Sequence, residues 1–254
     1  MNTVYNYRMT VQYDGTRYLG WQKLGAAGSE QYGRTIQGKL EAILSRMTGE
    51  DIEVNGSGRT DAGVHAVGQV ANFKTAFHTS EQEIMHYVNR YLPEDIAVTD
   101  VREAPERFHA RLNARAKTYR YTILNSAAPD PFRQRFEYRY EGALDTERMR
   151  AGAELLCGTH DFRNFCSSRR TKKSTVRTVY SIDADRDGDR IILTFRGNVF
   201  LYNMVRILAG TLIEIGRSER QPEDIPALFD AGSRASAGYT APARGLTLVS
   251  VEYE

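Results

Sequence analysis

Cysteine is almost absent from this sequence, with only Cys157 and Cys166 among 254 residues. Two cysteines are too few to hold a chain of this length together by disulfides, which excludes the disulfide-rich secreted scaffolds. The five histidines are scattered along the chain, and the sequence contains neither a CxxC pair nor a histidine cluster. The sequence therefore predicts no metal site.

Long hydrophobic runs are also missing. No apolar stretch approaches the roughly 20 residues that a membrane-spanning helix needs, and the opening MNTVYNYRMT lacks the apolar core of a signal peptide. Hydrophobic residues make up 41% of the chain and charged residues 26%, as in ordinary globular proteins. We expect a cytoplasmic protein without a membrane partner, large enough for one big domain or two small ones.

Two segments carry charge of one sign only. The formal net charge is +2, yet residues 107–120 contain five basic side chains, residues 163–177 contain six, and neither segment contains an acidic one. The aromatic residues among these cations are Phe108, Tyr119, Tyr121, Phe162 and Phe165. Because cations attract phosphates and aromatic rings stack on bases, the pattern favours a nucleic-acid partner over two merely solvated faces.

The first half of the sequence predicts the element order βαββαβ. Residues 5–13 alternate between apolar and polar, which is typical of a strand with one buried face. Thr35 can cap a helix with one apolar stripe. Ser80 with Glu83 can open a second helix, which has Ile84, Val88 and Tyr91 on its inward face and ends before Pro93. Strands predicted at 52–57, 66–73 and 95–101 complete the order.

The second half is expected to repeat this order. Strands are predicted at 116–124, 175–184, 190–197 and 246–253, with an added strand at 136–140. Helices are predicted at 145–157 and 201–215, and Asp187-Gly188 marks a hairpin. The sequence thus predicts an α+β fold of two βαββαβ halves, residues 1–105 and 106–254, with helices on one face of the sheet and the other face available for a ligand.

Asp61 lies in the predicted connection between strands 52–57 and 66–73, within the stretch NGSGRTDAGVHA. A loop aspartate is usually a turn-forming residue. Here Gly58 and Gly63 would let a ligand approach the backbone, and Arg59 supplies a cation nearby. An aspartate near guanidinium groups stays ionised and can act as nucleophile or base, so Asp61 is the candidate catalytic residue.

Two residues of the second half have both a structural and a functional interpretation. Arg206 belongs to a mainly apolar helix, where it either occupies the exposed stripe or needs a carboxylate partner. Tyr119 points to the same side of its strand as Tyr121 and Ile123, so it either packs in the core or stacks on a nucleotide base. The residues around them are compatible with both interpretations.

Four segments together carry a family resemblance. GSGRTDAGVHA, FHARLNARAKTYRY, GNVFLYNMVRILAGTLIEIG and APARGLTLVSVEY resemble, in order and spacing, the TruA family of tRNA pseudouridine synthases. The resemblance covers nearly the whole chain. It implies two ferredoxin-like halves with a mixed, mainly antiparallel sheet and an RNA cleft, a homodimer, and no metal or organic cofactor.

The resemblance also implies roles for individual residues. Asp61 falls on the catalytic aspartate, and Arg206 on the arginine that pairs with this carboxylate. Tyr119 falls on the tyrosine that contacts the target nucleotide, and Arg59 on the arginine associated with base flipping. Two segments fall where the family contacts RNA, and their residues are Phe108, His109, Ala110, Arg111 and Leu112, and Arg169, Arg170, Thr171, Lys172 and Lys173.

The implied reaction is the isomerisation of uridine to pseudouridine in the tRNA anticodon stem-loop, at positions 38–40. A stacked base is out of reach, so the nucleotide must first leave the stack at a cost of a few kcal/mol. Ionised Asp61 then acts as the nucleophile while the bond from ribose to N1 breaks and the base rejoins through C5. Three routes fit these residues: attack on the ribose, addition to uracil C6, and sugar deprotonation with help from Tyr119.

Two other classes of protein share parts of this pattern. A non-catalytic RNA-binding protein with tandem RRM-like folds would have the same element order, but it should carry the strand motif (K/R)-G-(F/Y)-(G/A)-F-V-x-(F/Y), which the sequence lacks. A hydrolase with a carboxylate pair would need a second acid at a defined separation from Asp61. The acids nearest in sequence are Glu50, Asp51 and Glu53.

Overall fold

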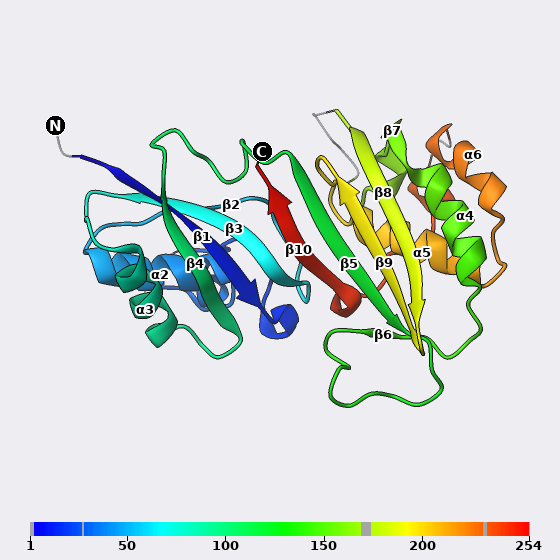
Figure 1. The fold of residues 1–254 in the computed structure, drawn as a ribbon, viewed down its shortest axis with the longest axis horizontal. Helices are drawn as coiled ribbons and strands as arrows, with labels where there is room; N and C mark the ends of the chain where they lie inside the picture. The colour runs from blue at the N-terminus through cyan, green and yellow to red at the C-terminus, as the bar shows by residue number, and fades with distance from the viewer. Residues whose placement is uncertain (1–2, 27, 169–173, 231–232, 254) are drawn as a thin grey trace. The chain divides into compact units, whose positions relative to one another are not determined.

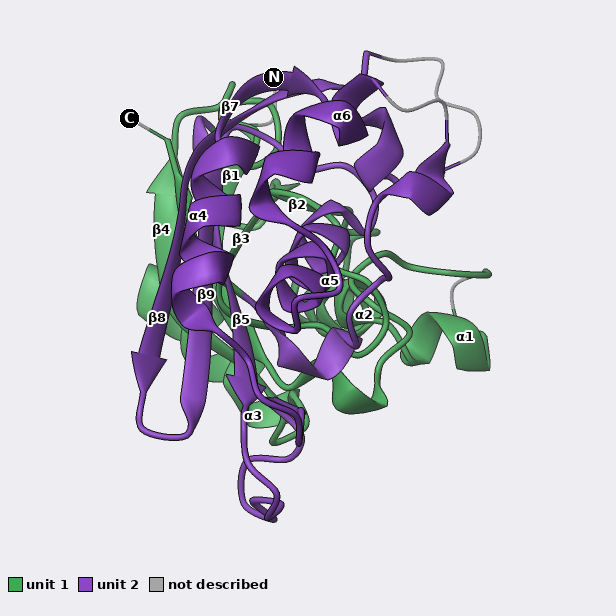
Figure 2. Ribbon diagram, turned by 90° about the vertical axis from the view of Figure 1, so that its right-hand side faces the viewer, with its two compact units in different colours: residues 1–114, 248–254 green, residues 115–247 purple. Residues whose placement is uncertain are grey.

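The computed structural model describes residues 3–26, 28–168, 174–230 and 233–253. The chain forms two compact units: unit 1 contains residues 1–114 and 248–254, and unit 2 contains residues 115–247 (Figure 2). Each unit combines helices with a mainly antiparallel sheet, so the predicted α+β class is confirmed.

Unit 1 has the element order that the sequence predicts (Figure 1). Its elements are β1 (Tyr5–Tyr13), the short α1 (Glu30–Gly33), α2 (Ile36–Thr48), β2 (Val54–Gly56), β3 (His65–Thr75), α3 (Glu81–Tyr91) and β4 (Ile96–Ala104). In the sheet, β1 pairs antiparallel with both β4 and β3, and β2 also pairs with β3. The last strand, β10 (Leu246–Glu252), comes next to β3, so two segments far apart in sequence share the sheet of unit 1.

The helices of unit 1 begin at the predicted caps. Thr35 accepts the Gly38 N–H with its side chain at the start of α2, and Ser80 accepts the Glu83 N–H at the start of α3. Each bond satisfies a backbone donor that the first turn of a helix leaves without a partner. The alternation in β1 buries four side chains in the core, namely Tyr7, Met9, Val11 and Tyr13.

Unit 2 contains an antiparallel sheet with one added parallel strand. Its elements are β5 (Ala116–Leu124), β6 (Tyr138–Arg139), α4 (Thr146–Leu156), β7 (Gly158–Asp161), β8 (Val176–Asp187), β9 (Arg190–Gly197), α5 (Met204–Gly216) and α6 (Ile225–Asp230). The strand order is β5, β9, β8, β7, and β6 lies parallel to β5. Helix α4 packs on β8 and on α5.

Three predicted features differ in detail from the structure. The strand predicted at 136–140 is only the two-residue β6. Helix α5 begins at Met204 instead of residue 201, because Asn203 adopts a left-handed backbone conformation (φ 61°) that the helix cannot include. Tyr91, which the helical pattern places inward, is 41% exposed, with the Arg46 guanidinium carbon 4.7 Å from its ring centre.

The boundary between the compact units falls after Ala114, whereas the two halves expected from the order of elements in the sequence meet near Pro105. Residues 105–113 stay with unit 1 because buried side chains of its sheet bind their backbone: the Asn6 amide donates to the carbonyl oxygens of Pro105 and Phe108. In the part of the chain that the structure describes, no helix is both long and apolar enough to cross a membrane.

Candidate active site and RNA-contacting segments

Asp61 lies in the loop that connects β2 to β3 and is half-buried. Its carbonyl oxygen accepts the Val64 N–H at 3.1 Å. Gly63 has φ 77°, a backbone conformation that few side chains tolerate. Asp61 is therefore part of a tight turn, and this turn fixes the backbone from which its carboxylate projects.

The backbone just before Asp61 is held by residues at the end of β1 and shortly after it. The Trp21 N–H donates to the Thr60 carbonyl oxygen at 3.0 Å, and the hydroxyls of Tyr13 and Thr60 lie 2.8 Å apart in the interior. Gly20 has φ 104°, and a Cβ atom at this position would lie 2.6 Å from the same carbonyl oxygen. Only glycine allows the two backbones to approach this closely.

Both ends of the Asp61 loop are also anchored by side chains of β3. Gln69 accepts a hydrogen bond from the Ser57 hydroxyl (2.7 Å) and donates one to the Gly58 carbonyl oxygen (3.0 Å). At the other end, Nδ1 of the buried His65 accepts the Gly15 N–H at 3.0 Å. The loop is thus bonded to its own unit on both sides of Asp61, which restricts the positions that the carboxylate can take.

The side chains of this loop alternate in exposure. Arg59 is exposed, Thr60 is buried and Asp61 is half-buried, so Arg59 reaches solvent beside the candidate nucleophile. Burial raises the pKa of Tyr13 to about 12, so its phenol is neutral at physiological pH. The contact of Tyr13 with Thr60 is therefore a hydrogen bond between neutral hydroxyls.

Tyr119 is buried in unit 2. Its side chain is 8% exposed, and its ring meets that of Phe200 edge to face, with 5.4 Å between the ring centres. It lies opposite Phe195 in the pairing of β5 with β9. These contacts hold the ring in one orientation, as stacking on a base requires, and they also fit a residue of the core.

Arg206 lies in the first turn of α5 and is half-buried. Its Nε donates to the Ala241 carbonyl oxygen at 2.7 Å, and one terminal nitrogen donates to Asn203 Oδ1 at 3.0 Å. Asn203 in turn donates from its amide nitrogen to the Ser167 hydroxyl at 3.0 Å. The guanidinium is thus oriented by neighbours within its own unit.

Sequence reasoning assigns no role to Asn203, although the structure shows that it orients Arg206. The sequence does contain a feature that could have pointed to Asn203. Asparagine adopts the left-handed conformation more readily than other residues with a side chain, and Asn203 stands directly before an apolar helix. An asparagine in this position can indicate a strained backbone conformation that is kept because the side chain binds its neighbours.

The predicted RNA-contacting residues 108–112 form a turn on unit 1. Phe108 packs against the ring of Tyr253, with 5.2 Å between the ring centres, and Ala110 is fully buried. Arg111 and Leu112 are exposed, and Leu112 is 77% exposed. The second predicted segment, Arg169–Lys173, lies outside the described residues.

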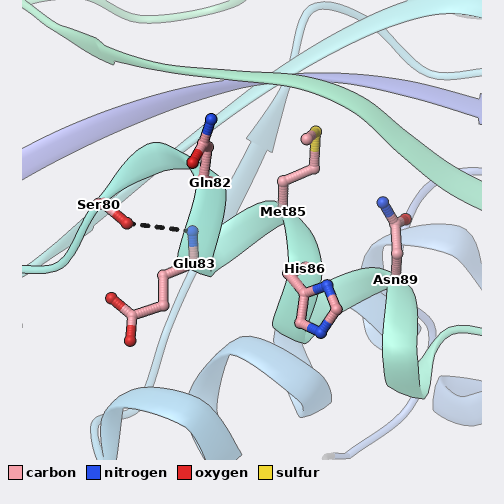
Figure 3. Close-up of a pocket in the computed structure, with 6 residues that line it drawn as sticks. All are labelled: Ser80, Gln82, Glu83, Met85, His86 and Asn89. Atoms are coloured by element: carbon pink, nitrogen blue, oxygen red, sulfur yellow. Dashed lines mark hydrogen bonds between the residues drawn. The ribbon is translucent and has the colours of Figure 1, made fainter.

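A surface hollow on unit 1 is separate from these candidates. Six residues at or near α3 line it (Figure 3), and they are Ser80, Gln82, Glu83, Met85, His86 and Asn89. Two of its polar side chains are already engaged, since Ser80 caps α3 and Asn89 bonds both backbone groups of Val98. Among the described residues, no group of three or more His, Cys, Asp or Glu side chains could hold a metal ion.

Comparison with known proteins agrees with the resemblance seen in the sequence. A family model described as tRNA pseudouridine synthase matches residues 9–113 and 153–254. Arg59, Asp61 and Arg206 fall within the matched segments, and Tyr119 falls between them.

Curated relatives match almost end to end. The chain is 44% identical over 248 residues to tRNA pseudouridine synthase A of Bacillus sp. (strain KSM-64), covering 98% of this chain and 99% of the relative. It is 42% identical to tRNA pseudouridine synthase A 2 of Bacillus cereus (strain ATCC 14579), covering 98% and 100%. It is 44% identical to tRNA pseudouridine synthase A of Geotalea uraniireducens (strain Rf4), covering 97% and 98%. Similarity of this extent shows that the chain belongs to the tRNA pseudouridine synthases, a family of isomerases.

Proposed function

We propose that this protein isomerises uridine to pseudouridine in the anticodon stem-loop of tRNA, at positions 38–40, with Asp61 as the nucleophile. The observation that carries the proposal is the anchored loop around Asp61, which is bonded on one side through Thr60 and on the other through His65. The reaction of a carboxylate with one particular carbon of a bound nucleotide is faster when the carboxylate is already held near the required position. A loop aspartate that only formed a turn would not need it.

The reaction needs only rearrangement within the nucleotide. The bond between ribose C1′ and uracil N1 breaks, the base rotates, and a bond forms between C1′ and C5. C5 loses its proton and N1 gains one, so the atoms balance without an oxidant, a reductant or a consumed water. In the route that we propose, the Asp61 carboxylate forms an ester with C1′ and leaves again when C5 attacks.

Other residues take the roles that the resemblance implies. Arg59, exposed next to Asp61, fills the space that the flipped nucleotide leaves or holds its phosphate. Tyr119 contacts the target nucleotide, and Arg206 supplies the cation for the catalytic carboxylate. Residues 108–112 bind the RNA, with Arg111 as the phosphate contact and Leu112 against apolar parts of the nucleotides.

We also propose a homodimer that works in the cytoplasm, as the resemblance implies. The excess of basic residues in segments 107–120 and 163–177 would give each copy an affinity for the tRNA backbone. Sedimentation of the purified protein would measure the mass of the assembly, and a mass of one chain at working concentration would contradict the dimer.

Release of tritium from uridine C5 tests the proposed function. Unmodified tRNA labelled at C5 is incubated with the protein. Isomerisation releases the label as tritiated water, leaves the RNA chain intact and liberates no uracil. A non-catalytic RNA-binding protein would bind this tRNA and release nothing. A hydrolase would liberate uracil. Sequencing of the product for pseudouridine then identifies the modified positions, and modification only outside the anticodon stem-loop would overturn the assignment of the substrate site.

A further inference from the structure

Two asparagines of unit 1 are buried on the side of the sheet that faces away from the core. The alternation of β1 places Tyr7 and Met9 in the core and Asn6 on the opposite side, and Asn72 of β3 lies on the same side as Asn6. Asn6 is nevertheless only 1% exposed and Asn72 only 2%. A buried amide needs hydrogen-bond partners, so the cover over this side of the sheet must provide them.

The cover is the segment 105–110, which follows β4 (Figure 1), and the two amides bind its backbone. Asn6 donates from Nδ2 to the carbonyl oxygens of Pro105 and Phe108, each at 2.9 Å. Asn72 donates to Asn6 Oδ1 at 2.9 Å and accepts the Ala110 N–H at 2.8 Å. The two asparagines thus form hydrogen bonds with three backbone groups of the segment.

Tyr253 holds the same segment from a distant part of the sequence. Its hydroxyl donates to the Ala110 carbonyl oxygen at 2.8 Å, and its ring packs on Phe108. The Arg8 guanidinium carbon lies 5.2 Å from the centre of the Tyr253 ring. Both backbone groups of Ala110 are therefore bound by side chains, one by Asn72 and the other by Tyr253.

This arrangement decides which side chains of the segment face outward. Phe108 and Ala110 point to unit 1 as anchors, while Arg111 and Leu112 are exposed. Asn113 closes the turn, because its Oδ1 accepts the His109 N–H at 2.8 Å and its own N–H donates to the His109 carbonyl oxygen at 3.1 Å. The turn is therefore held by hydrogen bonds within the chain itself.

We propose that Asn6, Asn72 and Tyr253 are positioning residues that hold residues 108–112 in their tRNA-binding conformation before tRNA arrives. Ordering a loop on binding costs affinity, and a preformed loop avoids this cost. Two apolar side chains in place of Asn6 and Asn72 would pack under the segment equally well, but they could not favour one backbone conformation of it. The hydrogen bonds of the two asparagines do favour one conformation. This inference rests on the proposed function, because it assumes that the segment contacts tRNA.

The test compares three single variants. Asn72→Ala removes the acceptor of the Ala110 N–H, and Tyr253→Phe removes only the hydroxyl that binds the Ala110 carbonyl oxygen. Asn89→Ala is the matched control, since Asn89 is likewise an asparagine of unit 1 that makes two hydrogen bonds. Its partners are the backbone groups of Val98 at 2.7 and 2.8 Å, and none belongs to the segment. The readouts are KM and kcat for tRNA, the thermal midpoint, and hydrogen exchange at the Ala110 amide.

We expect Asn72→Ala to raise KM about tenfold and Tyr253→Phe about threefold, with kcat changed by less than about threefold. Asn72→Ala removes the bonds to Asn6 and Ala110, whereas Tyr253→Phe removes one bond to Ala110. Both changes loosen the binding turn and leave the Asp61 loop intact. Exchange at the Ala110 amide should accelerate in Asn72→Ala and stay slow in Asn89→Ala. If Asn72→Ala does not fold, Tyr253→Phe still decides the question, since it keeps the ring against Phe108.

Two results would overturn the inference in different ways. If Arg111→Ala weakens tRNA binding while the Asn72 and Tyr253 variants change KM no more than Asn89→Ala does, the segment binds RNA but these residues do not position it. If Arg111→Ala, Leu112→Ala and the positioning variants all leave KM unchanged in an enzyme that still releases tritium, the RNA contact assigned to the segment is wrong, and the inference fails with it.

Discussion

The hydroxyls of Tyr13 and Thr60 lie 2.8 Å apart inside unit 1, one residue before Asp61. This bond ties the end of β1 to the loop of the candidate nucleophile, although the two are far apart in sequence. Because Tyr13 is buried, its hydroxyl needs hydrogen-bond partners within the protein, and Thr60 is one of them.

Tyr13→Phe should therefore slow the chemical step without weakening tRNA binding. The change leaves the Thr60 hydroxyl with one partner fewer, and we expect a loss of about 1 kcal/mol in the free energy of unfolding. We also expect single-turnover rates to fall by about three- to tenfold, since a looser loop populates the reactive position of Asp61 less often. Tyr5→Phe, in the same strand, is the control. Equal rates in the two variants would remove Tyr13 from the positioning of Asp61.

The same variant should change the stability of the protein at alkaline pH. The pKa of Tyr13 is raised to about 12 by burial, above the value of about 10 for an unfolded chain. The stability that the neutral phenol contributes is complete below pH 10 and is lost as the pH rises towards 12. Denaturant midpoints measured between pH 9 and 12 should fall less steeply in Tyr13→Phe than in the parent protein.

Asp61→Asn should abolish turnover and leave tRNA binding within a few-fold. The substitution keeps the size of the side chain and removes only its charge, so the anchored loop should be retained. Single-turnover tritium release and filter binding measure the two effects. Asp51→Asn, an exposed acid that precedes the same loop, should behave like the parent protein. Product formation above a few per cent of the parent level would exclude Asp61 as the nucleophile.

Tyr119→Phe separates the two interpretations of this tyrosine. Phenylalanine keeps the ring against Phe200, so RNA affinity should persist. If the hydroxyl acts on the nucleotide, the chemical step should fall by roughly 10²–10⁴-fold. Tyr121→Phe is the matched control, because the Tyr121 hydroxyl donates to the Pro242 carbonyl oxygen at 2.9 Å and should cost only about 1 kcal/mol of stability when removed. Near-normal chemistry in Tyr119→Phe would assign Tyr119 to the core.

Asn203 can be tested with two variants that differ only in backbone freedom. Both Asn203→Gly and Asn203→Ala remove the oxygen that orients Arg206, but glycine adopts φ 61° without strain, whereas alanine adds a cost of about 1 kcal/mol. We expect both variants to lose about tenfold in kcat and only the alanine variant to lose further stability. A glycine variant with normal kcat would show that the contact with Arg206 is dispensable.

The salt dependence of tRNA binding tests the second basic segment. Neutralising Arg169, Arg170, Lys172 and Lys173 together should weaken binding and flatten its dependence on salt. Each lost phosphate contact should remove roughly 0.7–0.9 from the slope of log K against log salt concentration. Titrations between low and moderate salt measure this slope, and an unchanged slope would show that these four side chains make no phosphate contacts.

The sequence predicts what depends on local patterns. The period-two alternation of residues 5–13 and the caps at Thr35 and Ser80 correspond to β1, α2 and α3. Turn chemistry also places Asp61 in a loop between strands. These features can be predicted because neighbouring residues determine them.

Contacts between distant residues were not predictable in this way. The periodicity of the sequence does not predict the Tyr13–Thr60 bond or the bonds from Asn72 and Tyr253 to the Ala110 backbone. The residues in each of these contacts are far apart in sequence and are brought together by the fold. The prediction for Tyr91 is wrong for a related reason. A helical pattern places every apolar side chain on the inward face, whereas the aromatic ring of Tyr91 lies at the surface beside the cation of Arg46.

Unit 1 is built from two segments of chain, residues 1–114 and 248–254, with all of unit 2 between them in sequence. A ribosome therefore makes the whole of unit 2 before it completes the strand β10 that lies beside β3. Until then β3 lacks that neighbour, and an uncovered strand edge can pair with other chains. The turn at residues 108–112 also lacks Tyr253 at this stage, so nascent protein should bind tRNA poorly until its synthesis has passed residue 253.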